Sequence, residues 1–389
     1  MLNSNVLSVG ASATIQVADR ARELKDGGEN VISFAVGEPD FDTPEHIKDK
    51  AKEALDIGFT KYTDLKGILP LRTRIAEKLL KENGLEYMPN DIIVSNGAKH
   101  AVFNALCALI NPGDEVIIIT PAWVSYVEQV KLLSGKPVLV SANDDYSLSP
   151  DKIEKAITDR TKAIIINTPC NPTGNVFTEK DLRVLADVVK KHDELYVISD
   201  EIYEKIVYSP NVHFSIASID KDIKDKTIVI NGFSKAYAMT GFRMGYSASN
   251  PEIAKMIARI QSHMTSCPNS ISQYCSVYAL MMDDVVLDGM IAEFAKRRKI
   301  VSDFLDAQPR LSYVPPQGAF YFLIDFSNYI GGRVKNDLEL SMYLLEKYHI
   351  ALTAGTAFFK GNHLRLSYAT SEENIIEGLV RLNQALLDI

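Results

Sequence analysis

Apolar and polar positions follow two recurring patterns along this chain, one typical of buried strands and one typical of helices. Short apolar runs at 92–95, 115–119 and 163–166 have the length and composition of strands buried on both faces. Between them lie stretches with helical spacing, such as 123–133. Because strands that alternate with helices form parallel sheets, the pattern predicts an α/β fold with a mainly parallel sheet covered by helices.

The pattern changes beyond residue 290. A long charged helix is predicted at 293–305, and strand-like segments follow at 319–324 and 364–368. These elements indicate a smaller α+β domain.

The N-terminal region is expected to begin with an arm, because residues 1–12 contain few helix signals. A helix is predicted to start at residue 44. Thr43 is a good N-cap, Pro44 suits the first helical position, and Glu45 suits the first turn.

Composition narrows the functional classes. The chain has 389 residues, of which 46% are hydrophobic, and its net charge of -8 argues against a nucleic-acid or membrane partner. No apolar stretch approaches the roughly 20 residues that span a bilayer. The first residues lack the basic and apolar segments of a signal peptide, so none is expected. The four cysteines form no Cys-x-x-Cys pair and suit reduced thiols, so a cytoplasmic protein is expected.

Lys235 is the most informative residue, because Arg243 follows it within a stretch rich in Gly, Ser and Ala after an apolar strand at 228–230. A lysine can hold an aldehyde as a Schiff base, and an arginine can hold a phosphate on the same molecule. Pyridoxal phosphate carries both groups. The alternative is a solvated loop with two ordinary charges.

Two further segments supply partners for such a cofactor. The strand at 196–200 ends in Asp200, where a carboxylate can keep a pyridine nitrogen protonated. Tyr203 follows it and can donate to the phenolate oxygen of the ring. Asn171 lies in the Asn-Pro-Thr-Gly turn after the strand at 163–166, and it is assigned to the same oxygen.

A phosphate site is predicted where Gly97, Ala98 and Lys99 follow a strand and open a helix, since a helix N-terminus exposes backbone N–H groups. An ordinary strand-to-helix turn is the alternative. Arg365 lies in a strand-like segment, and its planar fork matches the carboxylate of an amino acid. Gly37 is expected to lend its backbone N–H to the same carboxylate, or else to be a turn residue with positive φ.

Taken together, these segments resemble the fold-type I aminotransferases, and most closely their bacterial and archaeal aspartate aminotransferase branch. The resemblance runs nearly end to end. The segments that carry it are residues 37–44, 96–99, 121–126, 171–174, 199–203 and 365–369, together with the segment around Lys235 and the pair Tyr62 and Gly67.

This resemblance implies a large, pyridoxal-phosphate-binding domain over 45–289 with a seven-stranded sheet. It also implies a small domain that joins 13–44 to 290–389. Lys235, Asp200 and Tyr203 take the catalytic roles. The implied cofactor contacts are Tyr62, Gly97, Ala98, Lys99, Trp123, Asn171, Asp200, Tyr203, Ser234, Lys235 and Arg243. Trp123, the only tryptophan, would stack on the pyridine ring, although large aromatic residues are often simply core.

The implied reaction is transamination from L-aspartate to 2-oxoglutarate, giving oxaloacetate and L-glutamate, with a Schiff base at Lys235 and ping-pong kinetics. The implied substrate contacts are Ser12, Thr14, Gly37, Lys99, Trp123, Asn171 and Arg365. Ser12, Thr14 and Lys99 would hold the distal carboxylate, although helix capping and a solvated lysine are alternatives. Family members that accept prephenate typically carry Lys-Pro where this chain has Gly10 and Ala11, so prephenate is expected to be a poor substrate.

Tyr62 resembles the family's tyrosine that reaches the phosphate of a neighbouring subunit, which implies a homodimer with composite active sites. A surface tyrosine is the alternative reading. Other activities on this fold stay open: transamination of alanine, aromatic amino acids or kynurenine, and carbon–sulfur lysis. A regulatory binding protein on an aminotransferase scaffold is a non-enzymatic alternative. No metal is expected, and no Gly-x-Gly-x-x-Gly or Gly-x-Ser-x-Gly motif supports a dehydrogenase or a hydrolase.

Overall fold

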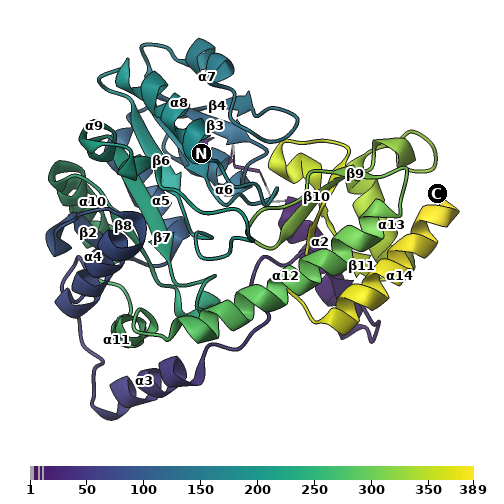
Figure 1. Cartoon of the computed structure of the whole chain (residues 1–389), viewed down its shortest axis with the longest axis horizontal. Helices are drawn as coiled ribbons and strands as arrows, with labels where there is room; N and C mark the ends of the chain where they lie inside the picture. The colour runs from purple at the N-terminus through teal and green to yellow at the C-terminus, as the bar shows by residue number, and fades with distance from the viewer. Residues whose placement is uncertain (1–3, 8, 11–12) are drawn as a thin grey trace.

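The computed structural model describes residues 4–7, 9–10 and 13–389, without the side chains of residues 4, 13–16 and 18. Figure 1 shows a larger part built around a sheet and a smaller part beside it. The long helix α12 (Asp284–Asp306) runs along both parts. Within the described ranges, no helix is long and apolar enough to cross a membrane.

A seven-stranded sheet forms the centre of the larger part, as expected. Six of the strands run in the same direction. The seventh, the short strand β8, pairs antiparallel with both of its neighbours. In spatial order the strands are β2 (Ile92–Ser95), β8 (Gly245–Ala248), β7 (Thr227–Gly232), β6 (Tyr196–Asp200), β5 (Thr161–Asn167), β3 (Glu115–Thr120) and β4 (Lys136–Ser141). The hydrophobic pattern missed β8, because Gly-Tyr-Ser-Ala contains no β-branched residue.

Helices cover both faces of this sheet, since successive strand residues point to opposite sides. Ile118 packs with the helices of one face, and its neighbours Ile117 and Ile119 pack with the helices of the other. The first face is covered by α5 (Ala98–Leu109), α6 (Val124–Leu132) and α10 (Pro251–Met264). The second face is covered by α4 (Leu69–Asn83), α7 (Pro150–Ala156), α8 (Glu179–Lys190), α9 (Lys221–Asp225) and α11 (Ser270–Ala279).

The smaller part contains a four-stranded antiparallel sheet with helices packed on it. Its strands, in order, are β12 (Thr353–Ala354), β13 (His363–Ser367), β10 (Tyr321–Asp325) and β9 (Ser312–Tyr313), and its helices include α13 (Asp337–Tyr348) and α14 (Glu372–Asp388).

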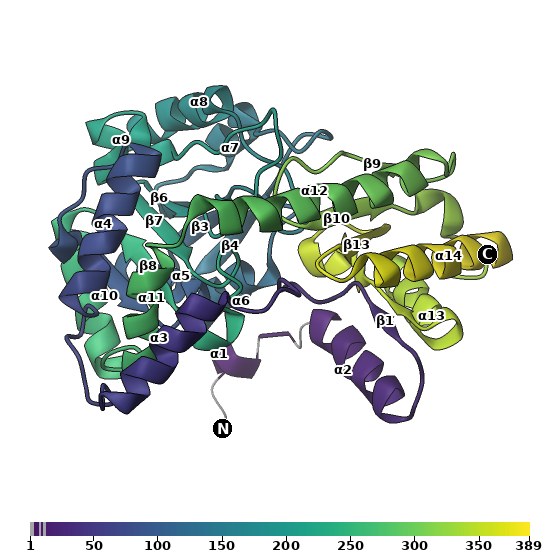
Figure 2. The same cartoon turned by 60° about the horizontal axis from the view of Figure 1, so that its bottom comes forward.

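The N-terminal segment crosses between the two parts. Figure 2 shows α1 (Ser4–Leu7) below the larger part, α2 (Ala13–Asp26) against the smaller part, and α3 (Glu45–Asp56) on the larger part again. The strand β1 (Ile32–Ser33) pairs in parallel with β11 (Ile350–Ala351), which ties both ends of the chain together. The domain boundaries at 44/45 and 289/290 remain predictions.

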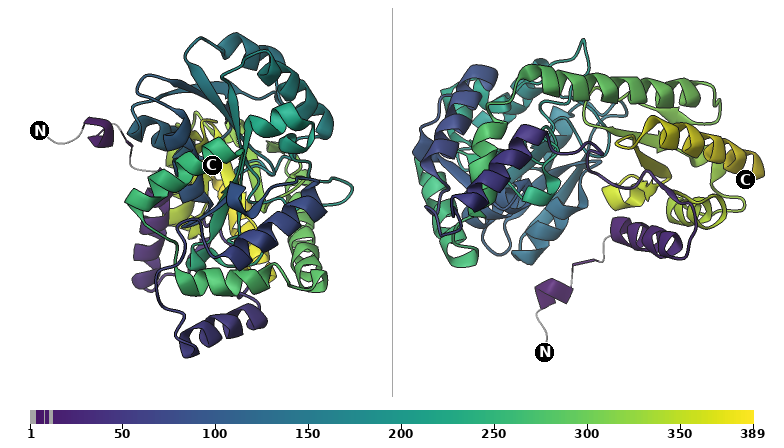
Figure 3. Two further views of the ribbon diagram at one scale, coloured as in Figure 1. Left: turned by 90° about the vertical axis from the view of Figure 1, so that its left-hand side faces the viewer. Right: turned by 90° about the horizontal axis from the view of Figure 1, so that it is seen from below.

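Three local predictions were wrong. The arm does contain a helix, because α1 precedes residue 12 (Figure 3), and the Asn5 side chain of this helix donates to the Ser134 hydroxyl of the larger part at 2.6 Å. The helix expected at 293–305 begins nine residues earlier, at Asp284, capped by the Asp283 side chain. Thr43 does not cap α3: the helix begins at Glu45, and the Thr43 hydroxyl donates to the carbonyl of Ala238 at 2.5 Å.

Candidate active site

A cavity of about 570 Å³ lies at the carboxyl ends of β5, β6 and β7. It is where ligands bind in open parallel sheets. The expected site residues that line it are Gly37, Ala98, Lys99, Trp123, Asn171, Asp200, Tyr203, Ser234, Lys235, Arg243 and Arg365.

Lys235 follows β7, and its ammonium group points into this cavity, where it donates to the carbonyl oxygen of Gly37 at 2.6 Å. Burial is the main cause that lowers the pKa of Lys235 to about 8, and the charges of Arg365 and Arg243 contribute to this shift against the opposing charges of Glu38 and Asp200. A lysine with this pKa is partly neutral near pH 8 and is therefore a nucleophile and a base.

Asp200 ends β6 and is buried at the wall of the cavity. Its Oδ2 accepts a hydrogen bond from the Tyr126 hydroxyl at 2.7 Å, and its Oδ1 accepts from the backbone N–H of Ile202 at 3.2 Å. Burial raises the pKa of Asp200 to about 6. A cation beside this carboxylate would favour its ionised form, so the position suits a protonated ring nitrogen.

Tyr126 was missed by the sequence analysis. The signal was available: Tyr126 lies three residues after Trp123, so both belong to one face of the first turn of α6. The two rings meet edge to face with their centroids 5.3 Å apart.

Tyr203 and Asn171 line the same cavity. The Tyr203 hydroxyl is 2.8 Å from the hydroxyl of Tyr321, which the sequence analysis also missed. Asn171 accepts a hydrogen bond from Arg365 through Oδ1 at 2.9 Å. Its amide therefore orients Arg365, in addition to any contact with a ligand.

Arg365, on β13, is a buried cation without a counter-ion among the described residues. Its Nη1 and Nη2 donate to Asn171 and to the carbonyl of Ala35, and its guanidinium lies 4.6 Å and 4.8 Å from the ring centroids of Tyr321 and Phe358. Its Nε is buried without a partner in the described structure. Because an unpaired buried charge is costly, this arrangement favours binding of an anion.

The predicted phosphate site is formed by the N-terminus of α5 and by Arg243. Gly97 has φ +84°, and a Cβ built on it would lie 2.8 Å from Arg243 Nη2, so the guanidinium packs directly against the start of the helix. The first N–H groups of a helix have no partner within it. Together with the arginine they form an anion site.

These residues fit pyridoxal phosphate. A lysine with a lowered pKa can receive its aldehyde, the α5 N-terminus with Arg243 can receive its phosphate, and Asp200 can face its ring nitrogen. Trp123 supplies an aromatic surface in the same wall.

Lys99 adds a further cation to the cavity. Its Nζ lies 4.8 Å from the Trp123 ring centroid, burial and the charge of Arg243 lower its pKa, and no described carboxylate pairs with it. Asp19 and Arg22 of α2, 3.6 Å apart, also line this cavity and were missed. Ser12 and the side chain of Thr14 lie outside the described residues.

One alternative needs correction. Gly37 does not adopt a positive φ; a Cβ there would lie 2.8 Å from the Tyr321 hydroxyl, so close approach is what favours glycine. Tyr62 is 92% exposed and does not line the cavity of its own chain, and its contact with a neighbouring subunit stays a prediction.

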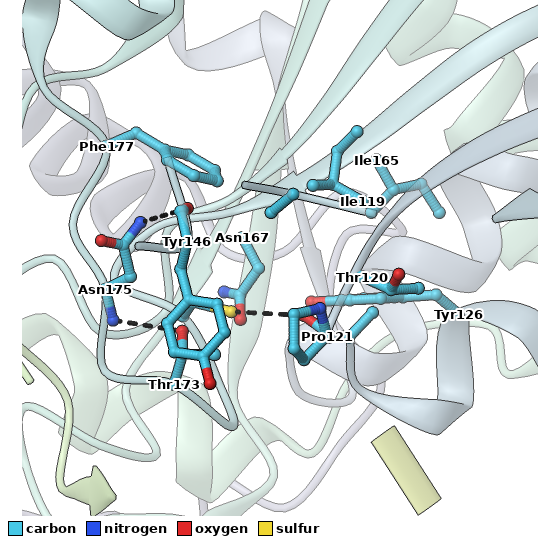
Figure 4. A pocket seen from close by; sticks show the side chains of 13 residues that line it. Ile119, Thr120, Pro121, Tyr126, Tyr146, Ile165, Asn167, Thr173, Asn175 and Phe177 are labelled. Carbon is cyan, nitrogen blue, oxygen red and sulfur yellow. Dashed lines mark hydrogen bonds between the residues drawn. The ribbon is translucent and has the colours of Figure 1, made fainter. Parts of the chain in front are cut away.

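A second, much smaller cavity of about 20 Å³ lies behind Tyr126 and Asn167, which line both cavities (Figure 4). It has room for about one water molecule. Cys170 contributes to its wall, and burial raises the pKa of this thiol, so Cys170 is an unreactive packed residue.

Known proteins resemble the chain over nearly its whole length. The family model for aminotransferase class I and II matches residues 29–382. The aspartate aminotransferase of Bacillus subtilis (strain 168) is 41% identical over 98% of each chain. The probable aspartate/prephenate aminotransferase of Aquifex aeolicus is 42% identical over 100% of this chain and 99% of its own.

Solved structures agree with this. The aspartate aminotransferase from Thermus thermophilus with maleate has a TM-score of 0.94 and 39% identity, and 99% of both chains is covered. The expected family, fold and cofactor are thereby confirmed. The chain belongs to the class I and II aminotransferases and is an aminotransferase that uses pyridoxal phosphate.

Proposed function

We propose that this protein transfers the amino group of L-aspartate to 2-oxoglutarate, giving oxaloacetate and L-glutamate. The observation that carries this proposal is the buried, uncompensated Arg365 in the same cavity as a lysine with a pKa of about 8. A carboxylate on Arg365 would bring the α-carbon of an amino acid toward Lys235. The relatives named for aspartate support this donor.

Pyridoxal phosphate, when bound, supplies the carbonyl group that exchanges with the amino group and a ring that withdraws electrons. Arg365 binds the α-carboxylate of the amino acid, oriented by its hydrogen bond to Asn171. The Lys235 amine removes the α-proton as a general base and later returns a proton. Asp200, held by Tyr126, keeps a proton on the ring nitrogen through its negative charge.

Both substrates carry an α-carboxylate and an α-carbon that reacts, so both use Arg365 and Lys235 in turn. The first product must leave before the second substrate enters. We therefore propose ping-pong kinetics.

Aspartate and 2-oxoglutarate also carry a second carboxylate, which needs a cation or several hydrogen bonds if it is to be buried. Lys99 is the proposed cation, with Ser12 and Thr14 as further donors. The Thermus thermophilus relative with maleate is consistent with this proposal, since maleate is a dicarboxylate.

The Aquifex aeolicus relative is named for aspartate and prephenate, so prephenate is the second candidate substrate. Gly10 and Ala11 place no cation at the position where members that accept prephenate carry lysine.

We further propose a homodimer with composite sites. Tyr62 is 92% exposed, and Ile57 and Leu65, which are close to it in the sequence, are also exposed apolar residues. Exposed apolar side chains that lie together favour a protein partner. A cytoplasmic location is proposed because all four cysteines are free.

Steady-state rates with 2-oxoglutarate as acceptor test the substrate. We expect kcat/KM for L-aspartate to exceed that for L-alanine and L-phenylalanine, with parallel double-reciprocal lines. Prephenate is tested as an alternative acceptor with L-aspartate as donor and is expected to react poorly. A higher kcat/KM for alanine or phenylalanine than for aspartate contradicts the assignment.

A further inference from the structure

The turn that carries Asp200 and Tyr203 has a second set of acidic residues on its rear side. Asp200 and Tyr203 face the cavity, whereas Glu201 and Glu204 are not part of its lining. Glu201 directly follows Asp200, and Glu204 directly follows Tyr203, so the two sets are interleaved along the same short segment. The transamination chemistry described above uses only the front set.

Glu201 is fully buried and is held by three side chains. Its Oε1 accepts hydrogen bonds from the Ser199 hydroxyl at 2.8 Å and from the Ser215 hydroxyl at 2.7 Å. Its Oε2 is 3.1 Å from Nε2 of His213. Its backbone N–H also donates to Ile230 on the neighbouring strand β7 at 2.8 Å.

Glu204 ties the same turn to helix α4. Its carboxylate pairs with the ammonium of Lys78 and accepts from Asn83 Nδ2 at 2.9 Å. Burial opposes its ionisation, but the charges of Lys78 and His213 prevail and lower the pKa of Glu204 to about 2. Glu204 is therefore paired with the Lys78 ammonium, and Glu201 with the His213 imidazole, on the rear side of the turn.

The three groups of Glu201, Glu204 and His213 lie within 4.8 Å of one another. Lys78 already supplies a cation at this place, and the two serines occupy the other Glu201 oxygen. The groups that face His213 are Glu201, Glu204 and Lys78. Burial lowers the pKa of His213, but the two carboxylates outweigh it and raise the pKa above its usual value. The cluster is thus a buried network of ion pairs and hydrogen bonds, in which Nδ1 of His213 alone among the described ring nitrogens of the cluster has no partner.

We propose that Glu201 and Glu204 are positioning residues that hold Asp200 and Tyr203 at the cavity through their contacts with His213, Ser215, Lys78 and Asn83. The inference rests on the proposed roles of Asp200 and Tyr203 toward the cofactor. A buried network of this kind stabilises one conformation of the backbone it is attached to. Because each rear residue directly follows a front residue in the chain, a shift of the rear pair moves the front pair as well.

Replacement of Glu201 by glutamine tests the proposal, with Glu115→Gln as the matched control. Glu115 is also a buried glutamate of this sheet, held by Lys136 at 2.8 Å and by the Thr158 hydroxyl at 2.7 Å, but it begins β3, at the end of the sheet opposite to Asp200. Both variants remove one buried carboxylate charge from an ion pair. Only Glu201→Gln touches the turn of Asp200.

Four quantities are measured for each holoenzyme: the melting temperature, the dissociation constant of pyridoxal phosphate, and kcat and KM for the preferred amino donor. Glu201→Gln is expected to lower kcat by about tenfold, because loss of a residue that holds a functional group commonly has an effect of this size. It is also expected to weaken cofactor binding and to leave KM nearly unchanged. Glu115→Gln is expected to lower the melting temperature while leaving kcat and the cofactor affinity near wild type. Ser215→Ala, which removes a single hydrogen bond to Glu201, is expected to change kcat in the same direction by a smaller factor.

Ser215→Ala also serves if Glu201→Gln does not fold, because it keeps every charge in the network. If kcat and the cofactor affinity are unchanged in Ser215→Ala and Glu201→Gln, the positioning role is overturned, even if both variants have lower melting temperatures. Equal losses of kcat in Glu115→Gln and Glu201→Gln overturn it too, because the effect would then follow from lost stability. A wild-type protein that binds no pyridoxal phosphate contradicts the proposed function instead, and the binding measurement separates the two cases.

Discussion

At the scale of single residues, the chemistry depends on how burial changes Lys235. A lysine with an ordinary pKa of 10.5 is neutral in fewer than about 1 in 100 molecules at pH 8, whereas a pKa of about 8 makes about half of them neutral. Only the neutral amine attacks an aldehyde. We expect the rate at which the apoprotein takes up pyridoxal phosphate covalently to rise with pH and to be half-maximal near pH 8.

Stopped-flow absorbance of the apoprotein mixed with pyridoxal phosphate gives this rate from pH 6 to 10. Arg365→Met provides a comparison, because the positive charge of Arg365 helps to lower the pKa of Lys235. Its removal should move the midpoint to higher pH. A midpoint near 10.5 in the wild type is the result that contradicts a lysine with a lowered pKa.

Arg365 and Lys99 are expected to differ in which substrates they affect. Hydrogen bonds to charged groups contribute about 1.5–3 kcal/mol, and every amino donor has an α-carboxylate, so Arg365→Lys should raise KM for aspartate and alanine alike. Lys99→Ala should raise KM for aspartate by about tenfold and leave alanine nearly unchanged, because only aspartate has the second charge. Steady-state kinetics with both donors measure this, and equal effects of Lys99→Ala on the two donors would count against its role.

At the scale of elements, the start of α5 makes a specific prediction about the phosphate site. Gly97→Ala places a Cβ 2.8 Å from Arg243 Nη2, so the arginine must move away from the helix N-terminus. Gly113→Ala is the matched control: Gly113 has a similar φ of +88°, and nothing lies within 4 Å of the added Cβ. Backbone strain is therefore present in both variants, whereas only Gly97→Ala crowds Arg243.

Equilibrium binding of pyridoxal phosphate, followed by absorbance, separates strain from crowding. We expect both variants to melt at lower temperature than the wild type, because both place a side chain at a positive φ. Only Gly97→Ala should weaken cofactor binding, by about tenfold. The same affinity in both variants would mean that Arg243 and the helix N-terminus do not form the phosphate site.

The elements also show how far a sequence predicts structure here. Long apolar runs such as β3 and β5 were predicted within one or two residues, because only a strand buried on both faces has that pattern. The short strand β8 and the first turns of α12 could not be read in this way. The conformation of β8 depends on the strands β2 and β7 between which it is held. The start of α12 is instead marked by its cap, Asp283, which is a local signal and not part of the hydrophobic pattern.

At the scale of the whole molecule, those site residues that depend on contacts between distant parts of the chain could not be predicted from the sequence. Lys235, Asp200 and Arg365 were predicted from strand ends, charges and the family pattern, and all three line one cavity. Tyr321, Asp19 and Arg22 were not predicted, because they reach that cavity only through the packing of the smaller part against the sheet. The cluster of Glu201, Glu204 and His213 was missed for the same reason, since its members come together only in the folded turn.

Assembly is the other property of the whole molecule that can be tested. If Tyr62 completes the phosphate site of a neighbouring subunit, mixing inactive Tyr62→Ala and Lys235→Ala proteins should restore activity. The heterodimer would contain one site with both residues intact, so up to about a quarter of wild-type activity is expected for random mixing. No recovery, after mass spectrometry has shown that subunits exchange, would contradict a shared site.

The central claim is that the chemistry takes place on Lys235 in the cavity of about 570 Å³. The most direct measurement is borohydride reduction of the purified holoenzyme, followed by proteolysis and mass spectrometry of the labelled peptide. The account predicts a single pyridoxyl label on Lys235 and none in Lys235→Ala. A label on a different lysine of the wild-type protein, or no label together with no visible absorption band, would contradict it.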